Sequence, residues 1–142
     1  MWILELTTDA ELREAFPVFH ELRYYVSEER FFERLASMRP RGYRVFAVRD
    51  GAQDQIVAYA GVEITETMRG RQLYVHEMVT TERARSKGYG AAMMAYLEEF
   101  ARSNDCDILA LSSNVAREGA HRFYETKIGM TRTSYLYRKE LR

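Results

Sequence analysis

The chain lacks several features that would assign it to a well-defined class of protein. It has one cysteine, so no disulfide can form within it, which fits a reducing compartment. Its 21 basic and 21 acidic residues balance, so no overall positive field draws it to nucleic acid or to an anionic membrane. The apolar part of the N-terminus is too short for a signal peptide or a membrane span. We therefore expect a cytoplasmic protein with no nucleic-acid partner and no membrane partner.

Residues that bind metals or act as nucleophiles are also scarce. The three histidines and the single cysteine are too dispersed to predict a metal site. Cys106 lies beside Asp105 and Asp107, whose charges would raise the pKa of the thiol, so we interpret it as a packing residue rather than a nucleophile. Neither G-x-G-x-x-G nor G-x-x-x-x-G-K-[ST] is present, which excludes two well-known phosphate loops.

What is present is a glycine turn between a predicted strand and a predicted helix. Residues 73–80 alternate and are rich in strand-forming residues, and residues 91–102 have helical periodicity. Between them lies Arg-Ser-Lys-Gly-Tyr-Gly, residues 85–90. The free N–H groups and the dipole of a helix N-terminus favour an anion, and glycines allow the backbone to approach it. This pattern predicts either a phosphate site or an ordinary turn on a solvated surface.

Two blocks of the sequence resemble the cofactor motifs of the GNAT superfamily of N-acetyltransferases. The first is the Arg-x-x-Gly-x-Gly pattern of residues 85–90, which resembles the family's pyrophosphate loop. The second consists of Ser113-Asn114, then AHRFYE at 120–125 and Ile-Gly-Met at 128–130, where the family usually has Phe in place of Met130. Together, in this order and separation, the blocks are more specific than either alone. The C-terminal half of the chain carries the resemblance strongly and the N-terminal half only by pattern.

The resemblance implies one domain over residues 1–142 with a mixed α/β, GNAT-like fold. Its central sheet would be mixed and mostly antiparallel, with about six to seven strands, about four flanking helices and a V-shaped splay between two parallel central strands. The patterns along the chain agree with this order. They predict strands at 2–6, 43–49, 55–65, 73–80, 107–114 and 132–141, and helices that begin at Thr8 or Asp9, after Ser27, at 91 and at 115.

The resemblance also implies roles for individual residues. Tyr124 would protonate the departing thiolate, because an unperturbed tyrosine pKa of about 10 approximately matches that of a thiol. The alternative for Tyr124 is a core residue. The residues that would contact acetyl-coenzyme A are Val79, Thr80, Arg85, Lys87, Gly88, Tyr89, Gly90, Asn114 and Arg117.

Glu77 is unexpected, because it falls among the apolar residues of one parity in its predicted strand. A carboxylate at an apolar position needs water or a polar partner, and a β-bulge could turn Glu77 to the other face of the strand. It would be either the general base for an acceptor amine or a structural carboxylate paired with an arginine. The segment Arg23, Tyr24 and Tyr25, at the join of two predicted helices, is either a wall of the acceptor pocket or simple packing of aromatic side chains on the sheet.

The predicted function is therefore that of an acyltransferase. The N-acetyltransferase would transfer the acetyl group of acetyl-coenzyme A to a primary amine of a small molecule, by direct attack in a ternary complex and without a metal. The alternatives are a protein lysine or N-terminal acetyltransferase, a non-catalytic acyl-coenzyme A sensor, and an interaction module that binds another phosphate. A homodimer is an expectation taken from the family.

Overall fold

The structure, a computed structural model, describes residues 1–142 in two compact units. The first unit is Met1–Leu111 and the second is Ser112–Arg142. The single domain expected from the sequence therefore remains a prediction, and each unit is described by itself.

One mixed sheet of five strands, in the order β1-β2-β3-β4-β5, forms the centre of the first unit. Neighbours from β1 to β4 are antiparallel, whereas β4 and β5 are parallel. The mixed, mostly antiparallel sheet is confirmed, but the predicted count of six to seven strands is wrong. The strands are β1 (Trp2–Leu6), β2 (Arg44–Asp50), β3 (Gln55–Thr67), β4 (Gly70–Thr80) and β5 (Ile108–Leu111).

The missing strand is the one predicted at residues 132–141. These residues alternate in sequence, but they form no ladder and their side chains are exposed. Alternation specifies which side chains share a face, and a strand also needs a neighbour for its backbone hydrogen bonds. As a result β5 lies at the edge of the sheet, and it has four half-buried residues where eight residues of a central strand were predicted.

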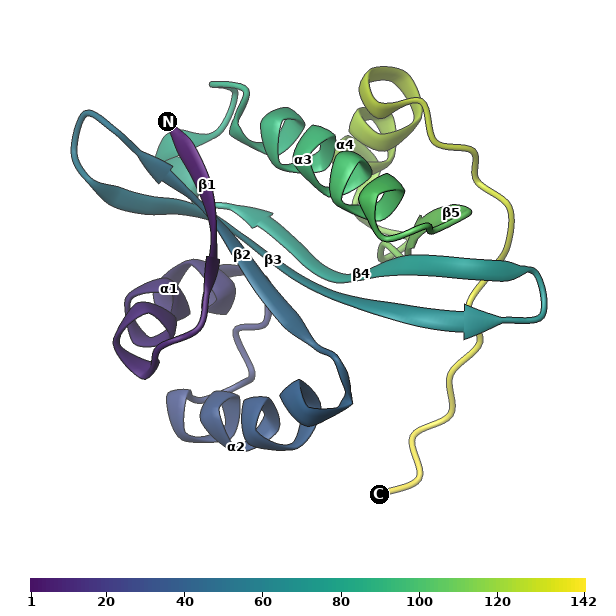
Figure 1. The fold of residues 1–142 in the computed structure, drawn as a ribbon, viewed down its shortest axis with the longest axis horizontal. Helices are drawn as coiled ribbons and strands as arrows, with labels where there is room; N and C mark the ends of the chain where they lie inside the picture. The colour runs from purple at the N-terminus through teal and green to yellow at the C-terminus, as the bar shows by residue number, and fades with distance from the viewer. The chain divides into compact units, whose positions relative to one another are not determined.

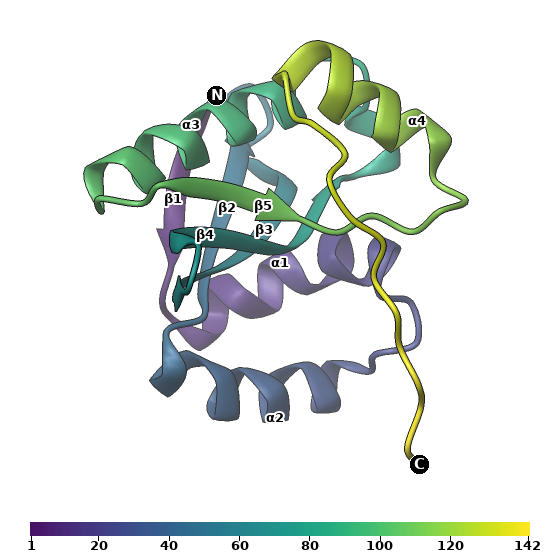
Figure 2. The ribbon, with the colours of Figure 1, turned by 90° about the vertical axis from the view of Figure 1, so that its right-hand side faces the viewer.

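Helices cover both faces of the sheet in the first unit. Figures 1 and 2 show α1 (Asp9–Leu22) and α2 (Glu28–Met38) on one face and α3 (Tyr89–Ser103) on the other. Between the last residue of α2 and the first strand that follows, Arg39–Arg41 forms a short 3-10 turn. None of the helices is long and apolar enough to cross a membrane.

Local capping explains where the first two helices begin. The Thr8 side chain accepts a hydrogen bond from the N–H of Glu11, whose carboxylate accepts from the N–H of Thr8 in return. Ser27 caps α2 through the N–H of Arg30. Both predicted starts are confirmed. Pro17 lies inside α1, which continues past it to its end at Leu22.

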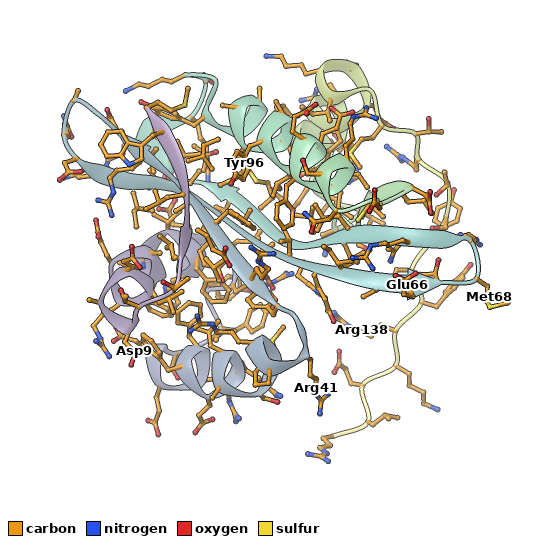
Figure 3. All side chains as sticks on the ribbon, in the orientation of Figure 1. Asp9, Arg41, Glu66, Met68, Tyr96 and Arg138 are labelled. Atoms are coloured by element: carbon orange, nitrogen blue, oxygen red, sulfur yellow. The ribbon has the colours of Figure 1, made fainter.

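The two faces of the sheet have separate apolar cores. Under α1 and α2, Phe19 lies with its ring centroid 4.7 Å from that of Phe31 and 5.2 Å from that of Tyr59. Under α3, Phe46 lies 5.4 Å from Tyr96 by the same measure, and Figure 3 labels this tyrosine on the helix. Figure 3 also shows Met68 at the tip of the β3–β4 hairpin, away from both cores. The core under α1 and α2 is the one that surrounds the candidate site.

The second unit contains one helical segment. Its α-helical part, α4, spans Glu118–Arg122 and continues into a π-helical turn at Phe123–Ile128. Gly129 ends the segment in a left-handed conformation with φ of 81°, as the sequence predicted for this position. The helix therefore begins three residues later than the predicted start at residue 115.

Candidate active site

A β-bulge in β4 sets the direction of Glu77. Gly61 of β3 pairs with Glu77, and the next residue, Val62, pairs with Val75, so His76 is the extra residue in β4. Val75 therefore shares a face with Val62, whereas Glu77 points to the face covered by α1 and α2. The bulge suggested by the parity of the sequence is confirmed, and it resolves the unexpected position of this carboxylate.

Two side chains hold the Glu77 carboxylate: Tyr43, just before β2, and Arg23, just after α1. The Tyr43 hydroxyl donates a hydrogen bond of 2.5 Å to Oε1 and lies 2.8 Å from the hydroxyl of Tyr59. The Arg23 Nε lies 3.7 Å from Oε2, and an Arg23 Nη2–H donates to the carbonyl oxygen of His76 at 2.9 Å. The Glu77 side chain keeps 13% of its surface exposed. Both interpretations of Glu77 thus have support. Its arginine partner fits a structural carboxylate, and its position facing a cavity fits a general base.

Burial dominates the ionisation of this cluster. It raises the pKa of Glu77, while the hydrogen bond from Tyr43 and the charges of Arg23 and His76 act in the opposite direction. Burial also raises the pKa of Tyr43 well above its usual value, and it raises that of Tyr59. Both tyrosines therefore stay protonated as hydrogen-bond donors. The Glu77 carboxylate binds a proton more readily than an exposed glutamate would, which suits a general base.

The absence of a side chain at Gly61 makes this arrangement possible. A Cβ atom at this position would overlap the Tyr43 hydroxyl and the Oε1 atom of Glu77. The close approach of the two polar groups to the backbone of β3 therefore requires glycine.

A cavity of about 150 Å³ lies in front of Glu77. Arg23 and Tyr25 of the predicted acceptor segment line this cavity together with the predicted base, Glu77. Tyr24 does not line it and is 75% exposed. The other lining residues are Phe19, Val26, Phe31, Arg34, Leu35, Met38 and Tyr43. The cavity is therefore mostly apolar, with a few charged groups, as small-molecule sites usually are.

Beside this cavity, the end of β4 has a neighbour on one side only. The pairing between β4 and β5 stops at Val75 and Leu111. Val79 and Thr80 pair with β3 and have no partner in β5. Backbone groups of this part of β4 that do not pair with β3 are thus available to an extended ligand that carries amides, except the Thr80 carbonyl oxygen, which accepts a hydrogen bond from Arg85.

The predicted phosphate loop, residues 85–90, lies shortly after β4 in the chain and leads into α3. Gly88 takes a left-handed conformation, with φ of 88°, at the N-cap of α3, and no side chain caps the helix. The first N–H groups of α3, at Tyr89 and Gly90, are therefore free to bind an anion. Arg85 and Lys87 are exposed, and the Arg85 Nε–H donates to the carbonyl oxygen of Thr80 at 3.2 Å.

Three predicted site residues belong to the second unit. The carbonyl oxygen of Asn114 accepts hydrogen bonds from the N–H of Arg117 and from Nε2 of His121. Tyr124 is 8% exposed, and burial raises its pKa. Its hydroxyl therefore keeps its proton at neutral pH.

Reasoning from the sequence missed Tyr43, Gly61 and Arg34 as site residues. Tyr43 and Glu77 are 34 positions apart, and only the register of the strands brings them together. The signal for Gly61 was present but ambiguous, because a glycine inside a strand marks either a bulge or a close approach of another group.

Comparisons with known proteins identify the family. The model of the acetyltransferase (GNAT) family matches residues 5–130. The uncharacterized N-acetyltransferase YhdJ of Bacillus subtilis (strain 168) is 35% identical over 136 residues, which cover 95% of each chain. An acetyltransferase of Trypanosoma brucei has a similar structure, with a TM-score of 0.81, 21% identity and 99% of each chain covered. Glucosamine-6-phosphate N-acetyltransferase of Arabidopsis thaliana gives 0.78 and 23%, with 99% of this chain and 98% of the other covered.

The matching family model and the curated relative define an acyltransferase, and the unpaired end of β4 with the glycine turn before α3 fits that class. The chain belongs to the GNAT family of N-acetyltransferases. Enzymes of this family generally use acetyl-coenzyme A as cosubstrate, act on amine acceptors and often dimerise. The resemblance to the GNAT family is thereby confirmed, and the roles of the residues in the two cofactor blocks stay predictions. The two solved structures are less than 25% identical and support the fold alone.

Proposed function

We propose that this enzyme transfers the acetyl group of acetyl-coenzyme A to the primary amine of a small molecule, by direct attack within a ternary complex. The observation that carries the proposal is the buried Glu77 carboxylate, which faces a cavity beside the stretch of β4 that β5 leaves unpaired. A cytoplasmic location and a homodimer belong to the same proposal.

The residues that would hold the cosubstrate fit its chemistry. Acetyl-coenzyme A supplies an acetyl group activated as a thioester. The backbone groups near Val79 and Thr80 that β5 leaves unpaired, apart from the Thr80 carbonyl oxygen bonded to Arg85, suit its amide-containing pantetheine arm. The uncapped N-terminus of α3 suits its pyrophosphate. The residues proposed to contact the pyrophosphate are Arg85, Lys87, Gly88, Tyr89 and Gly90, and Asn114 and Arg117 of the second unit are proposed for the pantetheine or adenosine end.

Glu77 is proposed as the general base. An ammonium group has no lone pair, so the carboxylate removes its proton, directly or through a water molecule, before the nitrogen attacks. Arg23 and Tyr43 fix the carboxylate at the cavity. A general base of this kind contributes about 10²- to 10⁴-fold to the rate.

Two further groups would complete the reaction. An N–H of β4 near Val79 would donate to the acetyl carbonyl oxygen as negative charge develops there. Tyr124 would donate its proton to the leaving sulfur, and its raised pKa keeps that proton in place until it is needed. No acyl-enzyme is required. Cys106 does not line the cavity, and burial raises the pKa of its thiol.

The cavity supports an enzyme that acts on an amine. Its volume of about 150 Å³ suits a small molecule, and because it opens to solvent it also suits the side chain of a lysine. A buried carboxylate that faces a cavity is expected of an enzyme that needs a base rather than of a domain that only senses acyl-coenzyme A. This feature ranks the enzyme above the sensor, and turnover with small amines and with peptides distinguishes the two kinds of acceptor.

Thermal unfolding followed by turnover tests the proposal. Acetyl-coenzyme A at 100 times its Kd should raise the Tm by about 10 °C, whereas ATP and NAD should not. Release of coenzyme A thiol is then measured with small primary amines and with lysine peptides. A Tm shift without turnover would indicate the sensor, and turnover with peptides alone would indicate a protein acceptor. An equal Tm shift with ATP would remove the basis for the proposal.

A further inference from the structure

The cavity in front of Glu77 contains one arginine that has no acidic partner. Arg34 of α2 lines the cavity, and no ion pair or hydrogen bond joins its side chain to another residue. Two other arginines of α1 and α2 are paired: Arg13 lies 3.1 Å from Glu28, and Arg30 lies 3.1 Å from Glu33. Arg41, which follows α2, also has no acidic partner. What distinguishes Arg34 is that its unpaired guanidinium belongs to a residue that lines the cavity.

The lining carries a net positive charge, and its unpaired member, Arg34, is exposed and therefore accessible to a ligand from solvent. The lining has one carboxylate, Glu77, and two guanidinium groups, Arg23 and Arg34, which leaves one positive charge in excess. Glu77 and Arg23 form an ion pair, so the excess lies at Arg34. A simple alkyl ammonium ion would enter a cavity of its own sign. An acceptor that also carries an anionic group would remove this mismatch, because each of its ends would meet an opposite charge.

The two charged groups that would meet the ligand, Glu77 and Arg34, belong to different layers of the first unit. Glu77 lies on the sheet and Arg34 on α2, and the rest of the lining is mainly apolar. Small-molecule sites commonly combine such apolar walls with a few polar groups that fix the orientation of the ligand. An acceptor with an amine at one end, a short apolar body and an oxyanion at the other end matches this distribution.

On the basis of the proposed acetyl transfer, we propose that the acceptor is an anionic amine, with its amine at Glu77 and a carboxylate or phosphate bound by Arg34. Arginine suits this task because its planar guanidinium donates two parallel hydrogen bonds to such groups. The cavity volume of about 150 Å³ suits a short body between the two ends.

Matched pairs of amines test the inference on the full chain. The pairs are 4-(aminomethyl)benzoate and benzylamine, 4-aminobutyrate and butylamine, and 2-aminoethyl phosphate and ethanolamine. With the wild type, kcat/KM should be about 10- to 100-fold higher for the anionic member of at least one pair. The pair that shows the difference distinguishes a carboxylate from a phosphate.

The variant Arg34→Ala should raise the KM for that anionic amine by about 10- to 100-fold, and the KM of the matched amine without the anionic group should stay the same or fall, because one positive charge has left the cavity. It should also abolish the Tm shift that the anionic amine causes in the presence of coenzyme A. Arg30→Ala is the matched control, because Arg30 is exposed on the same helix and outside the cavity. Arg34→Lys should recover part of the loss, since it restores the charge without the two parallel hydrogen bonds.

Two results would overturn the inference. One leaves the proposed acetyl transfer in place, and the other contradicts it as well. Equal kcat/KM values within every pair, or Arg34→Ala behaving like Arg30→Ala, would overturn the anionic acceptor and leave acetyl transfer in place. Thiol release with none of the amines, although acetyl-coenzyme A binds, would overturn the proposed function and this inference together.

Discussion

Glu77→Gln separates the proposed chemistry of this residue from its place in the fold. Glutamine keeps the size of the side chain, and its amide oxygen can accept the hydrogen bond that Tyr43 now donates to the carboxylate. It cannot take a proton from an ammonium group at neutral pH. We therefore expect kcat/KM to fall by about 10²- to 10⁴-fold, while acetyl-coenzyme A still raises the Tm.

The same variant should change the pH dependence of stability in a defined direction. Burial raises the pKa of Glu77 in the folded protein, so the folded state binds this proton more tightly than the unfolded chain does. The resulting stabilisation is fully present below the ordinary pKa of glutamate, about 4.3, and is lost as the pH rises through the raised value. Glutamine does not titrate, so Glu77→Gln should lose less stability over this window, by about 1.4 kcal/mol for each unit of the pKa shift.

Two measurements check these expectations. Thiol release is followed from about pH 5 to about pH 9, where wild-type kcat/KM should fall on the acidic side as Glu77 takes up its proton. Urea unfolding of both proteins at about pH 5 and about pH 8 gives the difference in stability. Wild-type turnover in Glu77→Gln would refute the role as base. An identical pH dependence of unfolding in both proteins would refute the effect of burial on the pKa.

Three other substitutions probe the surroundings. Tyr43→Phe removes a hydrogen bond that lowers the pKa of Glu77, so the acidic fall of kcat/KM should move to higher pH; an unmoved profile would count against that contact. Gly61→Ala places a methyl group against both polar groups and should cost about 1–3 kcal/mol in urea unfolding, with lower turnover; an unchanged protein would contradict the close approach. Tyr124→Phe should lower kcat and leave acetyl-coenzyme A affinity nearly intact, and unchanged turnover across the pH range would exclude its role as acid.

Local interactions explain what the sequence predicted well. The helix starts at Thr8 and Ser27 depend on hydrogen bonds between residues three apart, so both are visible in the sequence. The left-handed turn at Gly88 is local in the same sense. These features needed no knowledge of which strands are neighbours.

Pairing over long distances explains what the sequence did not predict. The alternation of Tyr135 and Tyr137 with their neighbours specifies faces, but it contains no information about a partner strand, and no strand forms there. The contact between Tyr43 and Glu77 depends on two successive antiparallel registers and on a bulge. Arg34 stands out because it lines the cavity and has no acidic partner. The sequence cannot show this, because one must know where all the nearby carboxylates lie.

The surroundings of Glu77 also bear on whether it is only a structural carboxylate. An ion pair with Arg23 alone could form at the exposed end of a strand, where desolvation costs little. Instead, Gly61 lacks the side chain that would block the site, Tyr43 directs a buried hydroxyl at the carboxylate, and the bulge turns it toward the cavity. Each of these features carries a cost in stability, and an apolar residue at position 77 would need none of them. Departures from local rules concentrate at functional sites, and here three of them meet at one carboxylate, which favours the base over the structural ion pair.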